Sequence, residues 1–156
     1  MKFGDVILTV ATTSVIYILV AAVLFMVLIS PLGSILAMNT SGIVSMLIAG
    51  LLGGVIFAGQ IQEESRMKAV GKIAVLLAFV ELFAVLIGFP TNSYYGAWTT
   101  ESLQSMYSTS AWTNADWFAY EGLVTFLNVA LNVVLVLVLG FIGLYAGSML
   151  RKPKKT

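Results

Sequence analysis

The chain of 156 residues is 60% hydrophobic and only 10% charged, far below the roughly 25% of charged residues in an average soluble protein. Its mean hydropathy is +1.01, which argues against a soluble domain, because such a domain cannot bury this much apolar surface. Eight basic and seven acidic residues lack the concentration of positive charge that a nucleic-acid partner needs. Cys and His are both absent, so we expect no disulfide, no metal site and no cofactor.

Four apolar stretches are each long enough for the roughly 20 residues that cross a bilayer as a helix. The first ends at Pro31 and is too long to be the apolar part of a cleaved signal peptide, so we expect it to remain in the protein. The third ends at Pro90. The prediction is an all-α integral membrane protein with one transmembrane domain spanning residues 1–156. The expected helices cover about 6–30, 42–61, 70–89 and 118–150, with an outer loop at 90–117.

The basic residues predict the orientation, because short loops rich in Lys and Arg stay in the cytoplasm. All eight fall before the first stretch, between the second and third, or after the fourth, and the segments 31–41 and 90–120 contain none. This pattern predicts a multi-pass protein of the cell membrane with cytoplasmic N- and C-termini. The basic residues are Lys2, Arg66, Lys68, Lys72, Arg151, Lys152, Lys154 and Lys155.

The outer loop is rich in Trp and Tyr, side chains that concentrate where lipid headgroups meet hydrocarbon. We expect it to lie on the membrane surface and to contain a short interfacial helix that begins near Thr100. Two interpretations of the loop stay open, a plain interfacial anchor and a binding surface for a partner or a lipid. The expected anchors are Tyr94, Tyr95, Trp98, Trp112 and Trp117.

Small residues recur at spacings of three or four in the second and fourth stretches. Lipid gives helices no hydrophobic reason to associate, so they pack where Gly and Ala allow their backbones to approach closely. We expect these rows to pack the bundle, and a homodimer face is the alternative. The candidate packing residues are Ala49, Gly50, Gly53, Gly54, Gly140, Gly143 and Gly147.

Glu81 is an ionisable residue in the interior of the third stretch. A charged, unpaired group costs several kcal/mol in hydrocarbon, so Glu81 should face protein or water. At about 1.5 Å per residue, its depth falls between those of Asn128 and Asn132, which share a face of the fourth helix with Thr125. These four residues form a predicted intramembrane polar cluster. It either holds the bundle together with Glu81 protonated or belongs to an ion or proton path.

No catalytic pattern occurs in the sequence, because without Cys and His the common nucleophile and base pairs are missing. The chain is therefore expected not to be an enzyme. The favoured hypothesis is a structural or accessory subunit of a membrane complex, in contact with the bilayer and with a membrane-protein partner or a second copy of itself. The alternatives are a small oligomeric transporter or channel that uses Glu81, and an outer-face binding module that uses the aromatic loop at 90–120.

Overall fold

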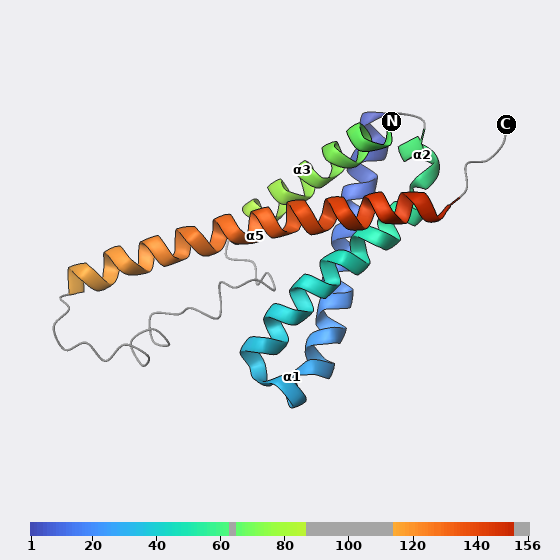
Figure 1. The fold of residues 1–156 in the computed structure, drawn as a ribbon. Helices are drawn as coiled ribbons and strands as arrows, with labels where there is room; N and C mark the ends of the chain where they lie inside the picture. Colours follow the sequence, from blue (N-terminus) through green and yellow to red (C-terminus); the bar gives the residue numbers. More distant parts are fainter. Residues whose placement is uncertain (63–64, 87–113, 152–156) are drawn as a thin grey trace.

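The computed structural model describes residues 1–62, 65–86 and 114–151, and every element within these ranges is a helix (Figure 1). The helices are α1 (Phe3–Ile56), α2 (Ala58–Gln62), α3 (Arg66–Leu86) and α5 (Asn114–Leu150). The predicted all-helical fold is confirmed for this part of the chain. The interfacial helix expected in the outer loop falls outside the described residues, as do positions 87–89 of the third predicted helix.

Helix α1 is a hairpin of two limbs. The backbone is helical over all 54 residues, but it reverses direction after Pro31, so the two halves lie side by side (Figure 1). We call Phe3–Leu32 the first limb and Thr40–Ile56 the second limb. The connection between the first two predicted helices is therefore itself helical. The first helix does not end at Pro31, as the sequence predicted, but continues through the reversal into the second. At the start of α1, the Lys2 amide donates a 3.1 Å hydrogen bond to the Asp5 carboxylate, which caps the first turn.

Three predicted helix boundaries need correction. The second predicted helix, 42–61, is interrupted by a single turn residue, Phe57, after which α2 continues to Gln62. The third begins at Arg66 rather than at 70, and the fourth begins at Asn114 rather than at 118, so the last four residues of the predicted outer loop are helical. Apolar periodicity marks where a helix enters hydrocarbon, whereas the backbone hydrogen bonds continue for another turn beyond that point.

Two helical segments of the described chain are long and apolar enough to cross a membrane, the first limb and Val129–Leu150 of α5. The second limb, with 17 residues, is apolar but shorter. Only 6% of the apolar window in the first limb is buried by the rest of the chain. The core helix of a soluble protein would be mostly buried, so the first limb does not resemble one.

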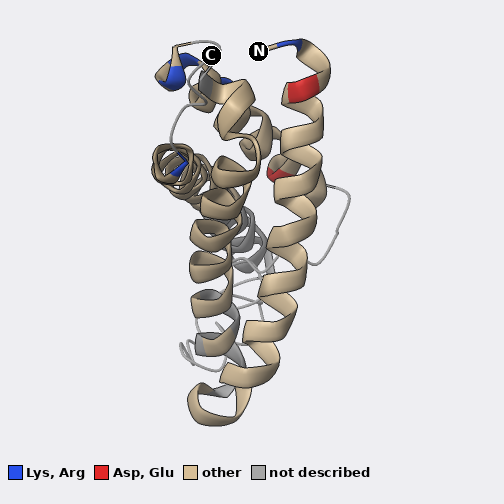
Figure 2. Cartoon of the chain, turned by 90° about the vertical axis from the view of Figure 1, so that its right-hand side faces the viewer, with Lys and Arg blue, Asp and Glu red and all other residues tan. Residues whose placement is uncertain are grey.

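The helices pack unequally. The most extensive interface joins α1 to α5, and α3 packs chiefly against α5, while α1 and α3 touch only slightly. The start of α1, the α2 helix, the start of α3 and the end of α5 lie at one end of the molecule (Figure 1). The Lys and Arg residues of the described part also lie toward this end (Figure 2). The end of the molecule that contains the Pro31 reversal carries none of these described basic residues.

Candidate functional site

Two of the predicted glycine rows meet between the second limb and α5. A β-carbon built on Gly50 would lie 3.1 Å from the Gly143 Cα. One built on Gly54 would lie 3.0 Å from the Gly147 Cα and would overlap the Leu144 carbonyl oxygen. The two backbones are therefore in direct contact, which only Gly permits on both sides. We call this contact the glycine interface.

The remaining packing candidates lie around the same contact. Ala49 is fully buried. A β-carbon built on Gly140 would lie 3.0 Å from the end of the Met46 side chain and 3.5 Å from Leu77 of α3. A β-carbon on Gly53 would overlap Thr13 Oγ1 of the first limb. One row of small residues on the second limb thus faces α5, and the other row faces the first limb.

Glu81 lies on α3, which packs chiefly against α5. These helices run in opposite directions (Figure 1). Their register follows from Gly140 of α5, because a β-carbon built on it would touch the side chain of Leu77. One turn after Leu77 on α3 is Glu81, and the corresponding turn back along α5 brings Val136 to this level, with Asn132 one turn further along α5. Glu81 is only 6% exposed and Asn132 only 4% exposed, as expected for side chains between two helices.

Tyr17 adds a third helix to this region. The carboxyl of Glu81 acts electrostatically on the Tyr17 hydroxyl, so the first limb lies within electrostatic range of α3 here. Tyr17 is half-buried and packs against the hydrophobic core. The sequence analysis did not include it in the polar cluster, although Thr9, Thr13 and Tyr17 follow one another at spacings of four. That polar row on an otherwise apolar helix was the available signal.

Asn132 has an unsatisfied donor. Its Nδ2 atom is buried and makes no hydrogen bond within the described structure, so a direct bond from this atom to Glu81 is not formed. Buried amides are normally hydrogen-bonded, and an unpaired one is commonly explained by an ordered water. A bond through one water therefore stays a prediction. We refer to Tyr17, Glu81 and Asn132 as the Glu81 cluster.

Other buried hydroxyls differ in how they are satisfied. Thr9 Oγ1 donates a 2.6 Å hydrogen bond to the Asp5 carbonyl, and Ser148 Oγ donates one of 2.8 Å to the Tyr145 carbonyl. Bonds of this kind satisfy a hydroxyl within its own helix. Thr13 is also fully buried, but its Oγ1 has no hydrogen-bond partner among the described residues. It faces the second limb at Gly53, where two helices meet closely.

Several predicted site residues cannot be placed. Thr125 and Asn128 lie on α5, and Trp117 lies near its start, but their side chains are outside those that the structure describes. The other four anchors, Tyr94, Tyr95, Trp98 and Trp112, belong to the undescribed segment 87–113. Within the described residues, no three His, Cys, Asp or Glu side chains come together as metal ligands would.

The sequence and the fold match no known protein family, no curated protein and no solved structure. A functional argument for this chain therefore depends on its own residues and their arrangement.

Proposed function

We propose that this chain is a non-catalytic, four-span protein of the cell membrane, with cytoplasmic termini, that acts as a structural or accessory subunit of a membrane complex. Three observations support the membrane part of the proposal. The most apolar window of the first limb is almost unburied, as lipid-facing helices are. The second limb is extended by α2, which brings its length closer to a span. The described basic residues lie toward one end of the molecule (Figure 2), which fits the positive-inside rule.

The observation that carries the subunit part is the projecting first half of α5. This helix has 37 residues, or about 55 Å at 1.5 Å per residue. A crossing of about 30 Å lengthens to about 40 Å at a tilt of 40°. Roughly ten residues of α5 must therefore extend beyond the hydrocarbon. Arg151 belongs at the cytoplasmic boundary, so the excess lies at the outer end.

The same half of α5 projects beyond the other described helices (Figure 1). Phe126, which lies on it, is 69% exposed. The second half of α5 is fixed by the glycine interface, so the projecting half is held in place. A helix of another membrane protein would find there a long, preorganised surface to pack against.

Cross-linking in native membranes tests this proposal. The chain has no cysteine, so Phe126→Cys introduces a single attachment point for a photoactivatable thiol reagent. Leu19→Cys is the matched control, because Leu19 is a 62% exposed residue of the first limb. We expect a cross-linked product of one defined mass at position 126 but not at 19, and a partner that co-purifies at fixed stoichiometry.

Two outcomes would contradict the subunit proposal. Identical, diffuse products at both positions would mean that lipid surrounds the projecting half of α5. Products that contain only this chain would instead indicate a homo-oligomer, the assembly that the second candidate function requires.

The Glu81 cluster supports that second candidate, a small oligomeric transporter or channel. Glu81 is a buried carboxyl, and Asn132, about a turn from its level, is a buried amide with an unsatisfied donor. Polar groups of this kind could admit water to the bundle, and water near an intramembrane carboxyl is what proton movement needs. Flux into proteoliposomes tests it. Under this function Glu81→Gln abolishes pH-dependent flux and leaves the fold intact, whereas no flux in wild-type vesicles would eliminate the candidate. The third candidate, an outer-face binding module, concerns residues outside the described ranges and stays a prediction.

A further inference from the structure

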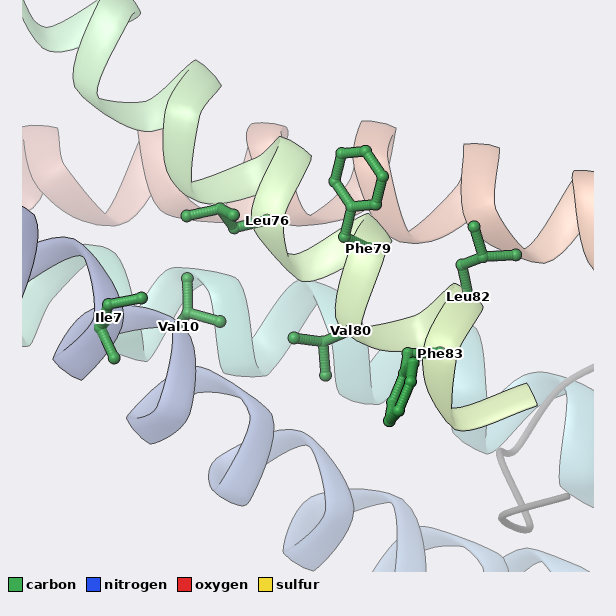
Figure 3. A pocket seen from close by; sticks show the side chains of 7 residues that line it. All are labelled: Ile7, Val10, Leu76, Phe79, Val80, Leu82 and Phe83. Atoms are coloured by element: carbon green, nitrogen blue, oxygen red, sulfur yellow. The ribbon is translucent and has the colours of Figure 1, made fainter. Parts of the chain in front are cut away.

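An open apolar groove runs between the first limb and α3 (Figure 3). Its volume is about 440 Å³, and its lining includes Ile7 and Val10 from the first limb and Leu76, Val80 and Phe83 from α3. Val80 and Phe83 point from α3 toward the first limb (Figure 3). The groove exists because α1 and α3 touch only slightly while both pack on α5.

A second hollow continues the groove toward the end of the molecule where α1 begins. Its volume is about 580 Å³, and it is lined by Phe3 and Val6 of the first limb and by Gly71, Lys72 and Leu76 of α3. Leu76 lines both hollows, so the two adjoin at this residue. We call the whole the α1/α3 groove. It has a basic side chain at one end and apolar walls at the other.

The length of the α1/α3 groove matches one leaflet of a bilayer. Lys72, Leu76, Val80 and Phe83 follow one another at spacings of four, four and three, which places them along one face of α3. Eleven residues separate Lys72 from Phe83, or about 16 Å along the helix. Half of a hydrocarbon core of about 30 Å is about 15 Å.

We propose that the α1/α3 groove binds one anionic phospholipid of the cytoplasmic leaflet, with its phosphate at the Lys72 ammonium and one acyl chain along Leu76, Val80 and Phe83. This inference rests on the proposed topology, which puts Lys72 at the cytoplasmic boundary. Basic pockets between helices on that side are suited to anionic headgroups. A protein helix is the poorer occupant, because helices approach one another at small residues, whereas this wall carries Phe79 and Phe83, which are 61% and 64% exposed.

Native mass spectrometry of the full chain tests the site. The protein is released from nanodiscs that contain equal parts of phosphatidylcholine and phosphatidylglycerol, and the retained lipid is counted. We expect wild type to retain one phosphatidylglycerol in preference to phosphatidylcholine. Lys72→Gln should lower this retention about fivefold, the effect of one basic residue at an anionic headgroup, and Lys72→Arg should restore it. Lys68→Gln is the matched control, because Lys68 is an exposed residue of the same helix that does not line the groove.

A second variant tests the acyl-chain half without changing the charge. Leu76→Trp fills the groove where its two hollows join, so it should lower retention by a similar factor while circular dichroism shows the helical content unchanged. Equal losses in Lys72→Gln and Lys68→Gln would mean diffuse attraction to the membrane surface and overturn the site. Full retention in Leu76→Trp would overturn it as well, and so would a groove occupied by a second copy of the chain, seen as a dimer that excludes lipid.

The topology on which this site rests is measured separately. A cysteine in place of Lys2 should be protected from an impermeant thiol reagent in intact cells. If it is labelled, the proposed topology fails and the lipid site fails with it. If it is protected and phosphatidylglycerol is not retained, only the lipid site is wrong.

Discussion

The glycine interface allows a quantitative prediction at Gly147. A β-carbon there would lie 2.8 Å from the Leu51 carbonyl carbon and 3.0 Å from its Cα, and it would overlap the Leu51 carbonyl oxygen. Ordinary contacts begin near 3.4 Å, so the second limb and α5 must separate by at least about 0.6 Å. The obstructing atoms belong to the backbone, which cannot turn away as a side chain can.

Overpacking of this kind costs about 1–3 kcal/mol, and replacing Gly by Ala within a helix recovers about 0.5–1 kcal/mol. We therefore expect Gly147→Ala to lower the free energy of unfolding by about 1–2 kcal/mol. Gly71→Ala is the control, because a β-carbon on Gly71 meets nothing within 4 Å. That variant should be unchanged or slightly more stable. Reversible unfolding in mixed micelles, titrated with a denaturing detergent, measures both variants.

The double variant tests whether one contact is responsible. Gly54 and Gly147 obstruct the same approach, so a single separation of the helices relieves both overlaps, and Gly54→Ala with Gly147→Ala should cost less than the sum of the two. If Gly147→Ala proves as stable as Gly71→Ala, the close contact of the two backbones is refuted.

Three other predictions use standard assays. Glu81→Gln should leave thermal stability in detergent nearly unchanged, while Glu81→Leu should lower the free energy of unfolding by about 1–2 kcal/mol, because polar groups around it lose their partner; equal stabilities would place Glu81 outside any polar cluster. Thr13→Val should be neutral or stabilising by up to about 1 kcal/mol, since it removes a buried hydroxyl that makes no hydrogen bond; a clear loss of stability would reveal a partner. Cysteine in place of Trp98 should react with an impermeant reagent in intact cells, and labelling of a cysteine at Lys155 instead would reverse the topology.

The pattern of the sequence was sufficient for the helices but not for their pairing. Gly50 and Gly54 are four residues apart and therefore lie on one face of a helix. Helix geometry alone was enough to predict this face as a site of close packing. This face meets Gly143 and Gly147 because of how two helices about ninety residues apart in the sequence are shifted along each other. The periodicity of the sequence carries no information about that shift. Pro31 was interpreted as the end of a helix, whereas the backbone remains helical through the reversal.

The surroundings of Glu81 show a similar limit. Its position on a small-residue face predicted that it would be buried, and it is only 6% exposed. Its partners were sought on the fourth helix because depth was counted along a straight, untilted bundle. The first limb was left out of that count, although Tyr17 comes within electrostatic range of Glu81. The tilt of the helices and their unequal packing determine which polar residues lie at the same depth along the bundle. Local sequence encodes neither the tilt nor the packing.

The order in which the chain is made bears on the glycine interface. Its two halves, Gly50 with Gly54 and Gly143 with Gly147, lie about ninety residues apart in the sequence, and synthesis proceeds from the N-terminus. Under the proposed topology, the second limb therefore waits in the membrane, with its glycine face uncovered, until the last part of α5 has been inserted. Any chain that ends before Gly140 would leave that face open to other small-residue helices. Under the proposed topology, quality control of this protein would thus depend on residues 140–148, because they complete the tightest contact of the fold.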